Sequence, residues 1–371
     1  RIMPTSGPTR EYPRKRITLT EFAKKLIHWS QQNGRTDLPW QQNPTAYRVW
    51  VSEVMLQQTQ ASTVVPYFNR FLNRFPTLPQ LAKASEDEVL ECWSGLGYYR
   101  RARHLRTAAI EIVEKHNGQV PASVDALARL PGIGRSTAGA IVALAFKRTA
   151  TILDGNVRRV LSRFYAVDGK RGAAKTEKQL WSHAEANTPA KQVDLYTQAI
   201  MDLGATVCIR SNPKCSVCPL ASECTAHGQG KEADYPIRPP RRPPRIQRAR
   251  FFMLINNQGA CLLQKRPASG VWASLWSPPQ HPQTTPVSVF IEAIGLSTTA
   301  IAKTFTGQKF RHAFSHYQLE IEPIYVFLGA TCRGIALDEH YRWHHPGERA
   351  EFGLSAVAAK LLSEIDSNGA S

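Results

Sequence analysis

The sequence predicts an all-α domain followed by a smaller α+β domain, and three observations support this prediction. Apolar residues recur at helical spacing between residues 18 and 206, and no convincing strand interrupts them. A segment rich in Pro and Arg, residues 236–245, cannot contribute to a hydrophobic core and is expected to be extended. Beyond it, short apolar runs bounded by turn residues are typical of strands. The 371 residues are enough for two domains, each with its own core.

The helices of the first part are predicted from their apolar faces and from the residues at their ends. In the first of them, Phe22, Leu26 and Trp29 share one face. The helix that begins at Arg135 follows a Gly-Ile-Gly turn, and the helix that begins at Asn156 follows Asp154, a common N-cap residue. The expected ranges are Thr18–Trp29, Tyr47–Phe71, Asp87–Trp93, Arg101–His116, Val124–Arg129, Arg135–Phe146, Asn156–Ala166, Lys175–Ala186 and Asp194–Leu203.

The second part combines strands with helices. Phe251–Ile255 and Cys261–Lys265 flank a turn, residues 256–259, and therefore predict a β-hairpin. Tyr317–Leu328 is a further β-rich run, whereas Val287–Ile294 and Leu354–Ile365 have helical patterns. The expected organisation is a basic tail (1–17), a helical domain (18–225) that includes a cysteine loop (208–224), a linker (226–249), an α+β domain (250–365) and a short tail (366–371).

The charge balance favours a polyanionic partner. Lys and Arg number 47 against 29 Asp and Glu, which gives a formal net charge of +18. The longest apolar stretch, Ala138–Phe146, is too short to cross a bilayer, and residues 1–16 lack the apolar segment of a secretory signal. We therefore expect a cytoplasmic protein that binds nucleic acid and no membrane.

One turn between helices has the features of a DNA-backbone contact. Gly132 and Gly134 let bare backbone approach a ligand, and the helix that follows presents unpaired N–H groups to an anion. Asp154 lies twenty residues beyond Gly134 and is expected to place a carboxylate near this phosphate-binding turn. The alternative is an ordinary Gly-x-Gly turn followed by an ordinary N-cap. A monovalent or divalent cation at residues 130–135 is also expected.

Four cysteines lie within seventeen residues and predict a metal site. Cys208, Cys215, Cys218 and Cys224 have the spacing C-x6-C-x2-C-x5-C, which lacks the two C-x2-C pairs of most zinc sites. One compact loop with four thiolates suits a [4Fe–4S] cluster, with structural zinc as the alternative. Its expected role is structural, and Arg210 and Lys214 could present charge to DNA.

Several motifs resemble the adenine DNA glycosylase (MutY) family of the helix-hairpin-helix-Gly/Pro-Asp superfamily. They are Leu38–Trp40, Ser52–Gln60, Gly95–Tyr99 and the hairpin, and in order and spacing they cover nearly all of 18–225. The cysteine spacing is similar to that of the endonuclease III and adenine glycosylase branch. Gly270–Trp276 resembles the family's Nudix-related domain. The resemblance implies a helix-hairpin-helix glycosylase domain with an iron–sulfur loop, followed by a Nudix-like α+β domain.

The resemblance also implies the catalytic residues. Glu53 is expected to protonate adenine at N7, and Asp154 to stabilise the oxocarbenium-like sugar or a glycosyl intermediate. Asn156 is expected to support the sugar or position Asp154. The apolar neighbours of Glu53 would raise its pKa, although without the resemblance a solvated glutamate on a polar stripe is the preferred interpretation. The helix N-terminus helps to keep Asp154 ionised.

The resemblance also implies residues that contact the adenine and the DNA duplex. Ser136 stands where endonuclease III-like relatives carry a nucleophilic lysine, and a hydroxyl cannot form a Schiff base. We therefore expect base removal without a strong lyase step. The adenine pocket is expected to contain Trp40, Gln41, Ser136 and Gln198, and the residues that bind or wedge into DNA are expected to be Gln58, Tyr98, Gly132, Gly134 and Arg135.

The C-terminal domain is expected to recognise the base opposite adenine. Phe314, Ser315 and His316 match the family's Phe-Ser-His loop, in which Ser315 would contact the Hoogsteen edge of 8-oxoguanine. Thr59 and Leu96 are expected to contact the same base. No acidic Arg-Glu-x-x-Glu-Glu motif is present, so pyrophosphate hydrolysis is not expected.

The predicted function is therefore excision of adenine mispaired with 8-oxoguanine, or more weakly with guanine, in double-stranded DNA. The protein is expected to act as a monomer in the cytoplasm, with the bacterial nucleoid. The alternatives are a bifunctional endonuclease III-like pyrimidine glycosylase, a non-catalytic DNA sensor and a Nudix hydrolase with a DNA-binding extension.

Overall fold

The computed structural model describes residues 20–237, 243–314, 317–329 and 338–368. The chain divides into two compact units. The first consists of Arg1–Val49, Ala122–Ala128 and Gly134–Pro239, and the second of Trp50–Pro121, Arg129–Ile133 and Pro240–Ser371. The helical domain expected over 18–225 is therefore shared between the two units, whereas the α+β part lies wholly in the second.

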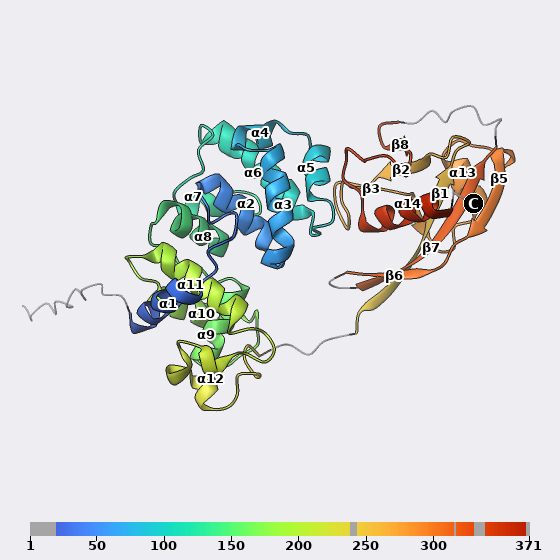
Figure 1. Cartoon of the computed structure of the whole chain (residues 1–371). Helices are drawn as coiled ribbons and strands as arrows, with labels where there is room; N and C mark the ends of the chain where they lie inside the picture. Colours follow the sequence, from blue (N-terminus) through green and yellow to red (C-terminus); the bar gives the residue numbers. More distant parts are fainter. Residues whose placement is uncertain (1–19, 238–242, 315–316, 330–337, 369–371) are drawn as a thin grey trace, which may run out of the picture. The chain divides into compact units, whose positions relative to one another are not determined.

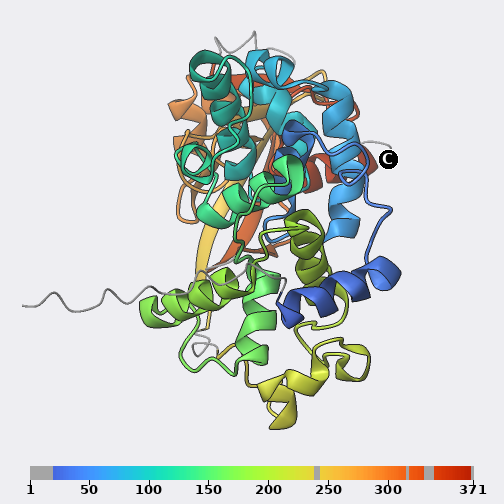
Figure 2. The ribbon, with the colours of Figure 1, turned by 90° about the vertical axis from the view of Figure 1, so that its left-hand side faces the viewer.

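The first unit is helical. Its helices are α1 (Glu21–Asn33), α7 (Val124–Ala128), α8 (Arg135–Phe146), α9 (Gly155–Phe164), α10 (Ala174–Asn187), α11 (Val193–Thr206) and α12 (Thr225–Gly228), with 3-10 turns at Cys215–Val217 and Ala221–Glu223. No strand occurs between residues 20 and 237, as predicted. Figures 1 and 2 both show α12 and the cysteine loop, in yellow, beneath the green helix α9.

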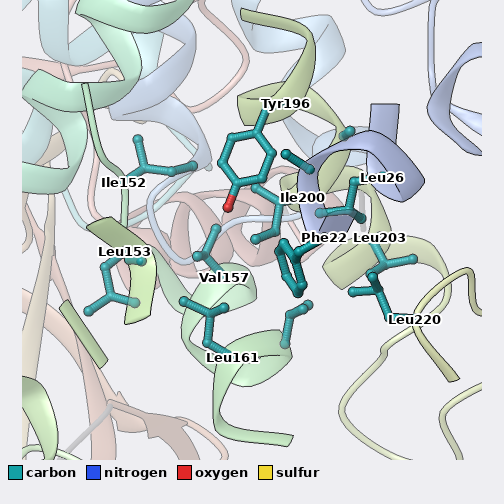
Figure 3. Packing of buried hydrophobic residues seen from close by; sticks show 14 of the residues in the cluster. Phe22, Leu26, Ile152, Leu153, Val157, Leu161, Tyr196, Ile200, Leu203 and Leu220 are labelled. Atoms are coloured by element: carbon teal, nitrogen blue, oxygen red, sulfur yellow. The ribbon is translucent and has the colours of Figure 1, made fainter. Parts of the chain in front are cut away.

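The core of the first unit joins the segments that carry the candidate functional residues. Figure 3 shows Phe22 and Leu26 from α1, Val157 and Leu161 from α9, and Tyr196, Ile200 and Leu203 from α11 packed against one another. Ile152 and Leu153, which directly precede Asp154, belong to the same buried cluster. Cys208 and Cys218 pack against it from the cysteine loop. One apolar cluster therefore fixes both the Asp154 segment and part of the cysteine loop.

The second unit begins with helices α3 (Ala61–Arg74), α4 (Leu78–Lys83), α5 (Glu86–Trp93) and α6 (Arg100–Lys115), and α2 (Ala46–Leu56) crosses into it from the first. The single helix predicted over Tyr47–Phe71 is wrong, because α2 ends at Leu56 and α3 begins at Ala61. Gln58 between them has φ 59°, a left-handed conformation that interrupts an α-helix.

In the described residues from 243 onward, the second unit forms an eight-stranded sheet and two α-helices. The strands are β1 (Arg245–Ile255), β2 (Cys261–Lys265), β3 (Trp276–Ser277), β4 (Gln280–Pro282), β5 (Ile301–Thr306), β6 (Phe310–Ala313), β7 (Tyr317–Leu328) and β8 (Tyr341–His344), and the helices are α13 (Val287–Ala293) and α14 (Ala356–Asn368).

The sheet is built around a long parallel pair. β1 and β7 pair from Arg245↔Tyr317 to Ile255↔Phe327, and both are buried along most of their length, as is usual for parallel strands. The predicted hairpin is confirmed, since β2 pairs antiparallel with β1 at Ile255↔Cys261. β6 and β7 form a second antiparallel hairpin, Phe310↔Ile321 to Ala313↔Gln318.

The linker, the possibility of a membrane span and two isolated cysteines can also be compared with the structure. The linker expected over 226–249 includes part of α12 at its start and the first residues of β1 at its end, so the segment between these elements is shorter. Among the described residues, no helix has the length and apolar character needed to span a membrane. Cys92 and Cys261 are buried.

Candidate active site

Asp154 is the N-cap residue of α9, and one of its carboxylate oxygens forms the capping hydrogen bond. Its Oδ1 accepts a hydrogen bond from the Val157 backbone N–H at 2.8 Å, the usual geometry of an N-cap. The preceding residue is held by the hairpin helix, because the Leu153 backbone N–H donates to Ser136 Oγ at 2.9 Å. α8 also lies very close to this segment, since a Cβ on Gly139 would be 2.2 Å from the Thr151 carbonyl oxygen. The Asp154 backbone is thus fixed from both sides.

The environment of Asp154 changes its titration. Burial raises the pKa of the carboxyl above its ordinary value, while the N–H groups of Val157 and Asn156 and the guanidinium groups of Arg159 and Arg158 act in the opposite direction. The helix N-terminus therefore favours the ionised form as expected, but it does not offset burial completely. Asp154 becomes ionised over a higher pH range than an exposed aspartate.

Arg159 joins the Asp154 segment to the cysteine loop. Its Nη2 donates to Asn156 Oδ1 at 2.9 Å and its Nε donates to the Cys208 carbonyl oxygen at 2.7 Å. Nη2 also donates to the carbonyl of Gly204, a glycine whose added Cβ would be 2.6 Å from Asn156 Cβ. Sequence analysis did not single out Arg159, because nothing in the sequence distinguishes it from the adjacent Arg158.

Glu53 lies in α2 and is partly buried. The neighbours one turn before it, Val49 and Trp50, are buried, so the expectation of apolar surroundings holds on that side. The other two neighbours, Leu56 and Gln57, are partly exposed. Glu53 belongs to the second unit and Asp154 to the first.

A buried arginine that sequence analysis missed holds the end of α2. Arg101 is 9% exposed and donates from Nη1 to the carbonyls of Val54, Met55 and Gln57 at 3.1, 2.7 and 2.6 Å. Its Nη2 donates to Thr59 Oγ1 at 3.3 Å and to the Gly97 carbonyl at 3.1 Å. Burial lowers the pKa of this guanidinium to about 10. Arg101 therefore holds together the segment around Gln58 and the segment around Tyr98, two candidate DNA contacts.

Those two segments carry the predicted wedge residues. Gln58 and Tyr98 are both exposed, Tyr98 by 48%, and both adopt left-handed conformations with φ of 59° and 49°. Left-handed residues other than glycine are uncommon and concentrate at functional sites. Thr59 is partly buried against Arg101, and Leu96 is 6% exposed, so its side chain packs mainly inside the protein.

The two glycines of the hairpin, Gly132 and Gly134, differ in conformation and surroundings. Gly132 has φ 77°, and a Cβ there would be 2.7 Å from His104 Cβ. A larger residue is therefore disfavoured both by the backbone conformation and by the lack of space. Gly134 is exposed and is the N-cap of α8. Arg135, the first residue of α8, lies with its guanidinium carbon 3.8 Å from the centre of the Trp181 ring and forms an ion pair with Glu185.

The predicted adenine-pocket residues all lie in the first unit. Trp40 is buried and Gln41 is partly buried, and Gln41 Oε1 has no hydrogen-bond partner in the described part of the chain. Gln198 donates from Nε2 to Asp202 Oδ1 at 2.9 Å, which leaves its carbonyl oxygen for another partner. An unsatisfied buried amide oxygen is costly and is typical of a site that binds a polar ligand.

All four clustered cysteines line one cavity, together with Arg163, His227 and Glu232. None of the four forms a disulfide. Burial raises the pKa of the Cys215 and Cys218 thiols to about 11, so metal binding would have to displace their protons. Arg163 donates from Nη1 to Cys208 Sγ at 3.4 Å, a contact that suits a thiolate ligand.

The donor set of this cavity fits a cluster with four thiolate ligands. Cys215, His227 and Glu232 also have ligand atoms within 4.8 Å of one another, a mixed set that zinc could accept. Zinc at these three residues would leave three thiols of the same cavity unused. The four thiols around one cavity therefore agree better with the iron–sulfur expectation.

In the C-terminal domain, Phe314 lies at the end of the β6–β7 hairpin. Its backbone N–H donates to the Tyr317 carbonyl at 2.9 Å, and its ring packs against Tyr317 and Trp272. Ser315 and His316, the other two residues of the predicted recognition loop, lie outside the described residues.

Comparison with known proteins gives the family. Residues 51–186 match the HhH-GPD superfamily of base excision DNA repair proteins, and residues 250–364 match the NUDIX domain. The chain is 35% identical to the adenine DNA glycosylase of Buchnera aphidicola (subspecies Acyrthosiphon pisum) over 94% of its own length and 98% of that protein. The chain belongs to the adenine DNA glycosylase family.

Other members of the adenine DNA glycosylase family are also similar. The rat protein is 38% identical over 70% of this chain and 60% of its own length. A solved structure of a thermostable thymine-DNA glycosylase aligns with a TM-score of 0.50 and 25% identity, covering 56% of this chain and 95% of that structure. The predicted helical glycosylase fold and Nudix-like domain are confirmed.

Proposed function

We propose that this protein hydrolyses the N-glycosidic bond of adenine mispaired with 8-oxoguanine, and more slowly of adenine mispaired with guanine, in double-stranded DNA. The main support is the similarity to a protein named adenine DNA glycosylase over 94% of the chain, which includes both domains. The net charge of +18 agrees with a DNA substrate. The protein is proposed to act as a monomer in the cytoplasm, associated with the bacterial nucleoid.

Two carboxyl groups are assigned opposite roles. Glu53 donates a proton to N7 of adenine, so that the base leaves as a neutral molecule. Asp154, ionised, stabilises the positive charge that develops on the sugar as the C1′–N9 bond breaks, and water then supplies the oxygen at C1′. Asp154 Oδ1 accepts the N-cap bond from Val157, which holds in place the carboxyl group that would face the sugar. Asn156 is assigned to orient this segment, in agreement with its bond to Arg159.

Ser136 distinguishes this reaction from that of a lyase. A serine hydroxyl cannot form the Schiff base that precedes strand cleavage. Its oxygen instead accepts the Leu153 N–H, which supports a role in holding the Asp154 segment. Endonuclease III-like glycosylase/lyase activity is the alternative, and a non-catalytic sensor is a second one.

The remaining residues are assigned to recognition. Trp40, Gln41 and Gln198 bind the extruded adenine, and Gln58 and Tyr98 enter the duplex beside it. Gly132, Gly134 and Arg135 contact the DNA backbone, and a cation at 130–135 remains part of this proposal. The assignment to 8-oxoguanine recognition comprises Thr59, Leu96, Phe314, Ser315 and His316.

The four cysteines are assigned as ligands of a [4Fe–4S] cluster. When bound, such a cluster would cross-link the loop and stabilise its fold. Cys208 and Cys218 already pack against the core of the first unit, so this loop is held partly by apolar contacts.

The test is incubation of the purified protein with duplexes that carry adenine opposite 8-oxoguanine, guanine or thymine, with abasic sites scored before and after alkali. We expect rapid release opposite 8-oxoguanine, slower release opposite guanine and strand breaks only after alkali. Glu53→Gln should lose excision and retain binding to the same duplex. A covalent adduct trapped by borohydride would favour the lyase alternative, and binding without any base release would favour the sensor. Hydrolysis of free nucleotides would favour a Nudix hydrolase.

A further inference from the structure

We propose that Trp272 is a positioning residue for the base opposite adenine: its ring holds Phe314, the residue directly after β6, and thereby sets the preference for 8-oxoguanine over guanine. This inference depends on the proposed function. Trp272 itself is 8% exposed and lies on a separate loop, residues 266–275, between β2 and β3. It is therefore placed to act through the hairpin.

The first line of evidence is the packing of aromatic rings around Trp272. Its ring centre is 4.9 Å from that of Phe314 and 5.2 Å from that of His312, and these two rings are 4.7 Å apart. Phe314 also stacks on Tyr317 at 4.7 Å. These edge-to-face and stacked arrangements have defined preferred geometries, so they hold the Phe314 ring in one orientation. Ser315 and His316 follow Phe314 directly in the sequence.

The second line of evidence is the backbone of the Trp272 loop. Trp272 and Ser274 have φ of 55° and 62°, and Gly270 has φ of 87°. A bulky residue in the left-handed region is a rare and strained conformation that persists where surrounding contacts require it. Here the Ser274 N–H donates to the Pro267 carbonyl and the Leu275 N–H to the Trp272 carbonyl, both at 3.0 Å. The loop thus maintains a strained conformation that directs a tryptophan toward the hairpin.

The third line of evidence is that the loop is anchored to the helices of the same unit. Arg103 of α6 donates to the Ala268 carbonyl. Asp87 of α5 accepts from Lys265 Nζ at 3.0 Å and from Trp276 Nε1 at 3.3 Å, one on each side of the loop. Trp276 is 1% exposed, so this contact is fixed in the interior. The position of Trp272 is therefore set relative to α5 and α6, not only within its own domain.

This arrangement matters because the two bases differ by few atoms. 8-Oxoguanine and guanine differ in an oxygen at C8 and a proton at N7, which hydrogen bonds must distinguish. Such bonds weaken steeply when distance or angle changes. A hairpin that moves freely would still allow adenine to be removed, but it would lose much of the difference between the two opposing bases. Trp272 should therefore affect the ratio of the two excision rates in addition to stability, whereas a residue that only packs the core should affect stability alone.

The experiment measures single-turnover excision from duplexes with adenine opposite 8-oxoguanine and opposite guanine, at saturating protein, for Trp272→Ala, Trp272→Phe and Asp87→Asn. Trp343→Leu is the matched control. Trp343 lies in the same domain and packs against the Phe252 and Phe290 cluster, without a described ring contact to the hairpin. Thermal unfolding is followed for every variant.

We expect Trp272→Ala to reduce the ratio of the rates by about tenfold, as follows from the loss of two aromatic contacts. Trp272→Phe should restore most of the ratio, Asp87→Asn should reduce it by a smaller factor, and Trp343→Leu should lower the melting temperature with the ratio unchanged. An unchanged ratio in a folded Trp272→Ala variant overturns the inference. So does an equal fall of the ratio in Trp343→Leu. A wild-type protein that does not discriminate the two duplexes would instead refute the proposed function.

Discussion

Replacement of Arg159 by Met should slow base excision, because this guanidinium holds Asn156 to the backbone of the cysteine loop. The variant removes donors from Asn156 Oδ1 and from the carbonyls of Cys208 and Gly204. A hydrogen bond to a charged group contributes about 1.5–3 kcal/mol, and water can replace part of this at a half-buried position. We therefore expect the free energy of unfolding to fall by about 2–4 kcal/mol.

The same variant should change the chemistry as well as the stability. If about 2 kcal/mol of the loss is expressed in the position of Asn156 and Asp154, single-turnover excision slows by roughly thirtyfold. The Arg159 charge also lowers the pKa of Asp154, so its removal should move the acidic limb of the pH–rate profile to higher pH. A purely structural role of Arg159 would not produce that movement.

The assay compares Arg159→Met with Lys25→Met in single-turnover excision across pH, in thermal unfolding and in visible absorbance, which would report the proposed iron–sulfur cluster. Lys25 forms an ion pair with Glu223 of the cysteine loop at 2.6 Å, and is the matched control for loss of a cation from that loop. The control should keep its rate and its pH profile. An Arg159→Met protein with the wild-type rate and profile would refute the reasoning.

Three further outcomes are expected. Asp154→Asn keeps an N-cap and removes a buried charged group whose pKa is raised, so it should raise the melting temperature at neutral pH by a few degrees. This gain should disappear as the pH falls below the pKa of an unfolded aspartate, about 3.9. A lower melting temperature at neutral pH contradicts the prediction. Ser136→Ala leaves the buried Leu153 N–H without its acceptor and should cost about 1–3 kcal/mol in a urea unfolding experiment, whereas Ser136→Thr should not. Arg101→Met should destabilise the protein by about 3 kcal/mol and weaken binding to an abasic duplex, and unaltered binding would mean that Arg101 does not position the Gln58 and Tyr98 segments.

The sequence predicts the helices well where local signals decide their ends. α8 has the predicted bounds, because a glycine turn precedes it and the apolar run stops at Phe146. The break between α2 and α3 was not predictable locally, since it contains neither Gly nor Pro and is held by Arg101 from a distant helix. α4 was missed although a signal exists, namely the capping box between Thr77 and Gln80.

The residues of the candidate site likewise fall into two groups, those that local sequence predicts and those that only the fold reveals. Asp154 and the cysteines are predicted from spacing, because the proposed chemistry would need these residue types at those intervals. Arg159 and Arg101 cannot be found in this way, since the chain contains many arginines and only the fold shows which of them are buried against carbonyl groups. The Trp272 conformation is likewise a property of a loop whose constraints come from other elements.

The parallel pairing of β1 with β7 has a practical consequence for dividing this protein into fragments. The two strands are 72 positions apart in register, so a growing chain exposes the apolar residues Phe251–Ile255 until the whole of Tyr317–Leu328 has been synthesised. A fragment that ends between these strands would keep the first and lack its long neighbour, and such unpaired apolar edges promote aggregation. Expression boundaries are therefore best placed before Arg245 or after α14.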